Sequence, residues 1–189
     1  MQFEVEQKHR VVDESHLLER LAERGVEIGP RVLQADRYFA HPSRDFARTD
    51  EALRIRTVGD KSFVTYKGPK IDVTTKTRQE IELPLDASDA DGLKFAGLLQ
   101  VLGFTQVLVV HKRRRAFAIN AHGRHVEGAL DEVDGVGTFV ELEILADEAE
   151  LEEAKRVVSQ LAAELQLGPS ERRSYLEMML EHLSKLVSN

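Results

Sequence analysis

The sequence predicts an α+β fold in which a curled, mainly antiparallel sheet of about eight strands is covered on the outside by helices. Many short segments alternate apolar with polar residues, and hairpin-type turn signals separate several of them. Only four segments show the apolar spacing of amphipathic helices. The chain has 189 residues and no evident linker or repeat, so a single domain covering residues 1–189 is expected.

The first predicted strand covers residues 2–10, where Phe3 and Val5 alternate with Glu4, Glu6 and Lys8. A period of two places the apolar residues on one face of the strand and the charged residues on the other. Antiparallel sheets commonly leave one face in water, so a charged face on a single strand is ordinary. The other strands must decide whether this face is a solvated surface or the lining of a site.

A first helix is expected over residues 13–25, because Leu17, Leu18 and Leu21 share a helical spacing and Gly25 is a stop signal. Strand patterns follow at residues 34–40, 52–58, 61–67 and 76–84. The Gly59-Asp60 pair between two of these strands is a hairpin-type turn signal, and it favours antiparallel pairing.

The second half of the chain begins with a helix predicted from about Ser88, as its N-cap, to Gly103. Three strands then follow at residues 106–120, 124–132 and 138–146. A turn around His122-Gly123 joins the first two of them. Two amphipathic helices are predicted at residues 148–167 and 170–187, with the breaker pair Gly168-Pro169 between them.

The charged face of the first strand recurs on later strands. On each later strand, a period of two again places charged residues on one face. These residues are Arg54 and Arg56 on one strand, Lys67 on the next, Lys76, Arg78, Glu80 and Glu82 on a third, Lys112 and Arg114 on a fourth, and Glu141 and Glu143 on a fifth. By the same parity, Arg113 and Arg115 should point the other way. About six strands of this kind fit a sheet curled so that the charged faces point inward and helices cover the apolar faces.

An interior lined by both signs of charge implies a charged ligand, because burying an unpaired ion costs several kcal/mol. Arginine and lysine suit phosphates, whereas carboxylates would repel the same anion unless a divalent metal ion bridges them to phosphate oxygens. A metal ion together with a triphosphate satisfies both signs of charge. The competing interpretation of each strand is a solvated face with weak surface ion pairs.

The composition narrows the class of protein. The net charge of -7 argues against a nucleic-acid or anionic-membrane surface, so the basic run HKRRR at residues 111–115 needs a local explanation. The absence of cysteine excludes disulfides and thiolate metal sites, which favours Mg²⁺ or Mn²⁺ if carboxylates cluster. No apolar run is long enough to cross a bilayer, and no secretory signal is evident, so a cytoplasmic location without a membrane partner is expected.

Several motifs occur in a characteristic order. They are Glu4-x-Glu6-x-Lys8, DRYFAHPSRDFARTDEALRIR (residues 36–56), TYKGPK (65–70), KTRQEIEL (76–83), HKRRR (111–115), ALDEVDGVGTFVELE (129–143) and RRSYLEMML (172–180). This ordered set, which covers nearly the whole chain, resembles the CYTH superfamily of triphosphate tunnel metalloenzymes, and within it the class IV adenylyl cyclase-like branch. The resemblance implies an eight-stranded antiparallel closed β-barrel (the triphosphate tunnel) with helices packed outside, Mg²⁺ or Mn²⁺, and ATP or another triphosphate as substrate.

The resemblance also implies roles for particular residues. The expected metal ligands are Glu4, Glu6, Asp131, Glu141 and Glu143, and the glutamates among them are the expected catalytic residues. The expected phosphate-binding residues are Lys8, Arg54, Arg56, Lys67, Lys112 and Arg114. Supporting roles fall to Lys76, Arg78, Glu80, Glu82 and Tyr175. Two residues have an alternative role. Asp131 could organise the turn that follows it and not bind metal, and Tyr175 could belong to the core.

Two reactions fit one such site. In an adenylyl cyclase, the ribose 3′-hydroxyl attacks the α-phosphorus of ATP and releases pyrophosphate; this is the leading interpretation. In a triphosphatase acting on tripolyphosphate or thiamine triphosphate, water attacks the terminal phosphorus and releases orthophosphate. A non-catalytic nucleotide or polyphosphate-binding module is a third interpretation, and RNA binding through HKRRR is disfavoured by the acidic net charge. The apolar helix faces are compatible with a homodimer.

Overall fold

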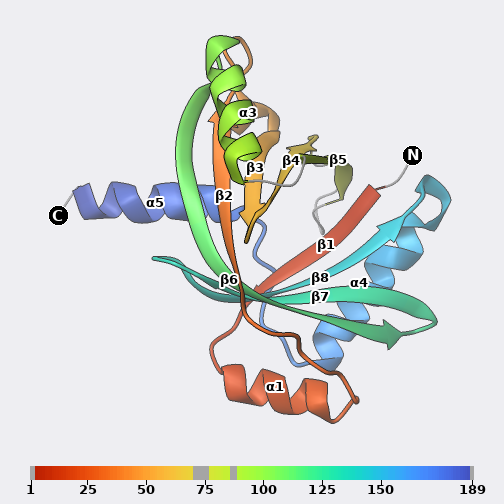
Figure 1. Ribbon diagram of the computed structural model, residues 1–189. Helices are drawn as coiled ribbons and strands as arrows, with labels where there is room; N and C mark the ends of the chain where they lie inside the picture. The colour runs from red at the N-terminus through yellow and green to blue at the C-terminus, as the bar shows by residue number, and fades with distance from the viewer. Residues whose placement is uncertain (1–2, 70–76, 86–88, 188–189) are drawn as a thin grey trace.

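A closed, antiparallel β-barrel forms the body of the protein (Figure 1). The computed structural model describes residues 3–69, 77–85 and 89–187. Within these residues eight strands are hydrogen-bonded in the order β1-β5-β4-β3-β2-β6-β7-β8, and β8 closes the barrel by pairing with β1. The predicted fold class, an eight-stranded antiparallel barrel with helices outside, is therefore confirmed.

The strands lie close to their predicted positions. Their bounds are β1 (Phe3–Arg10), β2 (Val32–Ala40), β3 (Ala52–Val58), β4 (Lys61–Lys67), β5 (Arg78–Leu85), β6 (Thr105–Ala121), β7 (Arg124–Val133) and β8 (Gly137–Ala146). The strand predicted from residue 76 begins outside the described residues, so Lys76 is not placed. The long strand β6 pairs with β2 along its first half and with β7 along its second half, so one strand joins two walls of the barrel.

The helices also match the prediction, with two differences, and the predicted N-cap Ser88 lies outside the described residues. Their bounds are α1 (Glu14–Ala22), α2 (Phe46–Thr49), α3 (Asp89–Val101), the 3₁₀ turn η1 (Glu148–Glu150), α4 (Leu151–Glu164) and α5 (Tyr175–Val187). The sequence did not predict α2, because four residues are too few for a helical period. The helix α5 begins at Tyr175 and not at residue 170, because Ser174 caps it.

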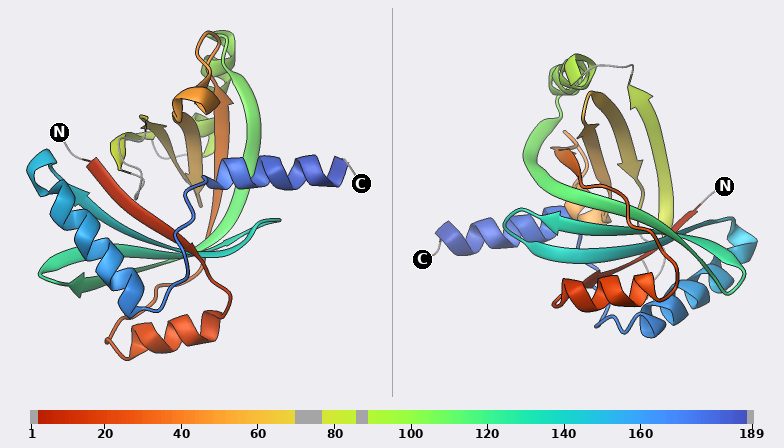
Figure 2. Two further views of the ribbon diagram at one scale, coloured as in Figure 1. Left: turned by 180° about the vertical axis from the view of Figure 1, so that it is seen from behind. Right: turned by 60° about the horizontal axis from the view of Figure 1, so that its bottom comes forward.

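Most of the apolar core lies outside the barrel, between its wall and the helices. On one side, α1 and α4 cover β1, β6, β7 and β8, as Figure 2 shows. There Val5 of β1 packs with Leu17 of α1 and Val158 of α4 in a single cluster. A second cluster joins α3 to β2 and β3, and a third joins α5 to β2, β6, β7 and β8. Because the apolar faces of the strands turn outward to these helices, their charged faces must line the interior.

The basic run on β6 shows this alternation directly. Lys112 and Arg114 face the interior, whereas Arg113 binds Asp134 on the outside at 2.7 Å and Arg115 contacts Glu14 of α1 at 3.3 Å. The predicted parity of these four residues is confirmed, and it gives the local explanation that HKRRR needed. No helix in the described part of the chain is long and apolar enough to span a membrane.

Candidate active site

A cavity of about 510 Å³ occupies the barrel interior. It brings together nearly all of the residues that the sequence singled out. Those that line it are Glu4, Glu6, Lys8, Arg54, Arg56, Lys67, Arg78, Glu80, Glu82, Lys112, Arg114, Glu141, Glu143 and Tyr175. Asp131 is buried behind this lining, and Lys76 lies outside the described residues. The prediction that the charged faces point inward is therefore confirmed, whereas the chemical role of each residue stays a prediction.

The arginines of β3 are fixed by a buried aspartate on the neighbouring strand. Asp36 of β2 accepts hydrogen bonds from Nε and Nη2 of Arg56 at 2.7 and 2.8 Å, and from Nη1 of Arg54 at 3.3 Å. Burial alone would raise the pKa of Asp36, but Arg54 and Arg56 outweigh it and hold that pKa far below its usual range. Sequence reasoning missed Asp36, because only the pairing of β2 with β3 brings it opposite Arg56.

Asp131 plays the same part for the cations of β6. It accepts hydrogen bonds from Nζ of Lys112 at 3.0 Å and from Nε and Nη2 of Arg114 at 2.7 and 2.5 Å. Nη2 of Arg114 also donates to Glu141 at 2.5 Å. Burial and the neighbouring Arg114 lower the pKa of Lys112 to about 8. The contacts of Asp131 are thus those of a carboxylate that orients two cations, and its role as a metal ligand remains untested.

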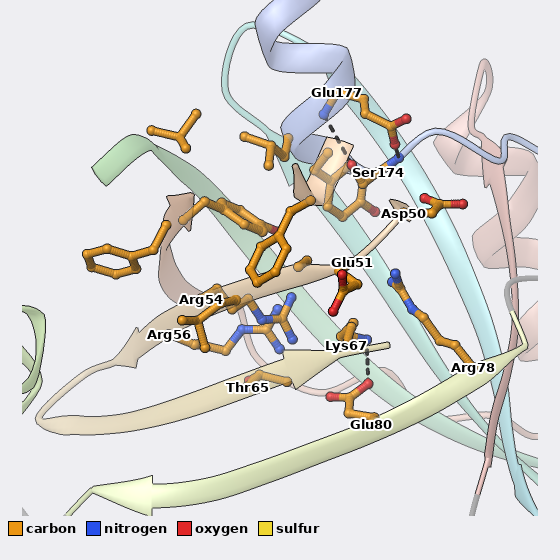
Figure 3. A pocket seen from close by; sticks show the side chains of 18 of the residues that line it. Asp50, Glu51, Arg54, Arg56, Thr65, Lys67, Arg78, Glu80, Ser174 and Glu177 are labelled. Carbon is orange, nitrogen blue, oxygen red and sulfur yellow. Dashed lines mark hydrogen bonds and ion pairs between the residues drawn. The ribbon is translucent and has the colours of Figure 1, made fainter. Parts of the chain in front are cut away.

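A third ion-pair group joins β4, β5 and β1. Nζ of Lys67 lies 2.8 and 2.7 Å from the two oxygens of Glu4. It also lies 2.5 Å from an oxygen of Glu80, a contact that Figure 3 draws. Burial would lower the pKa of Lys67, but the negative charges of Glu4 and Glu80 together outweigh it and the pKa is raised. Two residues further along the same pair of strands, Oγ1 of Thr65 on β4 donates a hydrogen bond to Oε2 of Glu82 on β5 at 3.0 Å. Lys67 of β4 is therefore held as a fixed positive charge between carboxylates of β5, which is the neighbour of β4, and of β1, which lies one strand further on.

Carboxylates crowd together on the β1–β8 side of the cavity. Burial, followed by the negative charges of Glu4 and Glu6, raises the pKa of Glu143 to about 9, and Lys67 only partly offsets this. Glu6 and Glu143 are opposite partners in the β1–β8 ladder, and Glu127, which the sequence reasoning missed, is opposite Glu143 from β7. A set of oxygen donors that repel one another is the kind of site that Mg²⁺ or Mn²⁺ stabilises.

The carboxylates do not form a complete coordination shell by themselves. Among the described residues, no three histidine, aspartate or glutamate side chains are grouped closely enough to hold a metal ion. The donor types therefore fit the predicted metal, and the positions of its ligands stay a prediction.

The start of α5 closes one side of the cavity. Ser174 and Glu177 form a capping box, because Glu177 N donates to Ser174 Oγ at 3.1 Å and Ser174 N donates to Glu177 Oε2 at 2.6 Å (Figure 3). Nζ of Lys8 donates to the carbonyl oxygen of Arg173 at 2.5 Å and lies 4.1 Å from the centroid of the Tyr175 ring. Burial, followed by Glu141, raises the pKa of Tyr175 well above its usual value.

One wall of the cavity is apolar. It is contributed by β2, α2, β3, β6 and α5, through Phe39, Phe46, Leu53, Val107, Leu176 and Leu180. Figure 3 shows aromatic and aliphatic side chains gathered on the side away from Arg78. Arg44, which lies over the Phe46 ring at 5.2 Å and pairs with Glu51 at 3.1 Å, also lines this part. The sequence did not reveal this wall, because its members come from five elements that are separate in the sequence.

A second cavity of about 360 Å³ approaches the same charged residues along β6, β7 and β8. It shares four lining residues with the first cavity, namely Arg114, Glu127, Glu141 and Glu143. The charged interior can therefore be reached from more than one side.

Comparison with known proteins agrees with this geometry. The chain is 36% identical, over 93% of its length and 98% of the relative, to a protein of Methanocaldococcus jannaschii provisionally named an adenylate cyclase. It is 32% identical to the adenylate cyclase CyaB of Aeromonas hydrophila, over 96% of this chain and 91% of that protein. A solved structure of a Pyrococcus horikoshii protein matches with a TM-score of 0.82 and 40% identity, covering 94% of this chain and 98% of that one.

The family comparison covers almost the same span. The CYTH domain matches residues 2–175, which include β1, the whole barrel and the first residue of α5. The chain therefore belongs to the CYTH domain family.

Proposed function

We propose that the protein is a metal-dependent adenylyl cyclase that converts ATP to cyclic AMP and pyrophosphate in the barrel cavity. The observation that carries this proposal is the pairing of two surfaces in one cavity, a cluster of buried cations and an apolar wall. Inorganic tripolyphosphate would use only the cations. The apolar wall is suited to an organic group attached to the triphosphate, such as a nucleobase. The names of the relatives in Methanocaldococcus jannaschii and Aeromonas hydrophila support the same assignment.

The cations of the cavity are proposed to bind and orient the triphosphate. Two pairs, Arg54 with Arg56 and Lys112 with Arg114, are held by Asp36 and Asp131. Because both pairs are fixed before the substrate arrives, little ordering remains to be done on binding. The remaining phosphate-binding residues in the proposal are Lys8 and Lys67.

The glutamates are proposed to hold Mg²⁺ or Mn²⁺, through Glu4, Glu6, Glu141 and Glu143, with phosphate oxygens completing the partial shell. A metal ion bound there would lower the pKa of the ribose 3′-hydroxyl and neutralise phosphate charge. The bond from the 3′-oxygen to the α-phosphorus forms as the bond to the leaving pyrophosphate breaks, and the hydroxyl proton passes to solvent. The basic residues neutralise the charge that develops on the pyrophosphate.

A triphosphatase acting on tripolyphosphate or thiamine triphosphate is the second candidate. The second cavity supports it, because that cavity reaches Glu141 and Glu143 and would admit water to the bound phosphates. A non-catalytic binding module would not need the carboxylates that crowd around Glu143. We assign a cytoplasmic location with this proposal, since the chain has no cysteine and the proposed substrate is ATP.

Product analysis distinguishes these candidates. Purified protein is incubated with Mg²⁺ or Mn²⁺ and, separately, with ATP, tripolyphosphate and thiamine triphosphate, and the products are separated by chromatography. Cyclic AMP with equimolar pyrophosphate supports the cyclase. Orthophosphate without a cyclic product overturns it in favour of the triphosphatase. Binding of triphosphates without any product would identify a binding module.

A further inference from the structure

The first residue of α5, Tyr175, brings a buried aromatic hydroxyl to the wall of the charged cavity. Tyr175 lines the cavity and is 5% exposed. Among the residues that the structure describes, its hydroxyl oxygen has no hydrogen-bond partner. A buried hydroxyl left without a partner costs about 1–3 kcal/mol, so native proteins rarely keep one without a reason.

The Tyr175 ring is held in place by its surroundings. Nζ of Lys8 lies 4.1 Å from its centroid and Nζ of Lys112 lies 5.1 Å from it, both over the ring, while the Phe139 ring packs against it at 5.5 Å. The capping box of Ser174 and Glu177 fixes the adjacent turn of α5. Since packing and capping already determine the orientation of the ring, the hydroxyl is not needed for this purpose.

The chemistry around this hydroxyl points to an anionic partner. Lys8 and Lys112, which stand over the ring, are two of the residues proposed to bind phosphate, so a phosphate bound by them would lie close to Tyr175. A phenol is neutral at pH 7 and is a good hydrogen-bond donor. A neutral donor can approach a phosphate oxygen without adding further positive charge to a site that is already densely charged.

We propose that the Tyr175 hydroxyl donates a hydrogen bond to a phosphate oxygen of the bound triphosphate, and that α5 thereby contributes a ligand-binding residue to the barrel. This inference rests on the proposed function, because it requires a triphosphate in the cavity. It assigns Tyr175 to substrate binding, as opposed to core packing alone.

Calorimetric binding of inorganic tripolyphosphate in the presence of Mg²⁺ tests the inference, because this ligand has no ribose hydroxyl that the proposed cyclase could activate. Tyr175→Phe should bind tripolyphosphate roughly tenfold more weakly than the wild type, as expected for loss of one hydrogen bond to a charged group. The melting temperature of the unliganded variant should be unchanged or higher, because the substitution removes an unpartnered buried hydroxyl. The matched control is Tyr66→Phe, whose hydroxyl donates to Glu51 at 2.5 Å and lies outside the cavity lining. Its affinity should stay within about twofold of the wild type.

The possible outcomes separate the inference from the proposed function. Equal affinities of the wild type and Tyr175→Phe would overturn the inference and leave the triphosphate cavity standing. A lower melting temperature of unliganded Tyr175→Phe would also overturn it, because the hydroxyl would then have a partner within the protein. Failure of the wild type to bind tripolyphosphate at all would instead overturn the proposed function, and the inference with it.

Discussion

Asp36 and Arg56 are directly opposite residues on β2 and β3, and the carboxylate of Asp36 accepts hydrogen bonds from Nε and Nη2 of Arg56 at 2.7 and 2.8 Å. Asp131 and Arg114 repeat this arrangement between β7 and β6. In both pairs the aspartate is almost fully buried and the arginine lies at the cavity wall. The two bidentate pairs fix the planar guanidinium groups, which are suited to phosphate recognition.

The carboxylates of β1 are expected to be essential for turnover. Glu6→Gln should reduce product formation at least about 100-fold, because an amide is a weaker metal ligand than a carboxylate. Chromatography measures turnover, and electron paramagnetic resonance of Mn²⁺ measures metal binding in the presence of ATP. The control is Glu132→Gln on the outer face of β7, where the side chain is 47% exposed. Unchanged activity in a well-folded Glu6→Gln protein would contradict the metal assignment.

The two faces of the barrel wall should differ in their effect on substrate binding. Arg56→Gln should weaken binding of ATP roughly tenfold or more, since it removes one of the proposed phosphate-binding cations from the cavity. Arg113→Gln should change the affinity less than about twofold, because Arg113 pairs with Asp134 on the outside. Titration calorimetry gives both dissociation constants. Similar effects of the two substitutions would show that the cations inside the barrel do not bind the substrate.

Loss of the buried carboxylate should destabilise the fold. Asp36→Asn should lower the free energy of unfolding by about 3–5 kcal/mol, because it leaves Arg54 and Arg56 without their buried counter-charge. The matched control is Asp134→Asn, which removes an exposed partner of Arg113 and should cost less than about 1 kcal/mol. Urea unfolding followed by circular dichroism measures both values. If the two variants were equally stable, the Asp36 network would not contribute to folding.

The contribution of Asp36 to the free energy of unfolding should decrease as the pH is lowered. Its pKa in the folded protein lies below the unfolded value of about 3.9, so the contribution is complete above that value and is lost as the pH falls further. Between about pH 5 and about pH 3, the difference in unfolding free energy between the wild type and Asp36→Asn should therefore narrow by roughly 1 kcal/mol. Urea unfolding of both proteins at the two pH values measures this change. A constant or widening difference would show that the folded-state pKa of Asp36 is not lowered.

Much of the barrel could be predicted from the sequence, because its main signal is local. A period of two assigns each side chain to one face of its strand, whatever the strand pairs with. The sequence therefore placed these side chains on the correct faces. Those predicted to face the interior are Glu4, Glu6, Lys8, Lys112 and Arg114, and those predicted to face outward are Arg113 and Arg115. The four longer helices could be predicted for the same reason, since their apolar spacing and stop signals lie within one segment.

Only the tertiary structure decided which charges meet. Lys67 binds Glu4 across 63 positions of sequence, and Arg114 binds Glu141 across 27, because closure of the barrel brings β4 near β1 and folds β6 to β8 together. The same closure buries Asp36 and Asp131 behind the arginines and assembles the apolar wall from five elements. The sequence alone determined which faces carry charge. Strand register and barrel closure, which depend on contacts between distant segments, determined the ion pairs, the burial and the position of Tyr175.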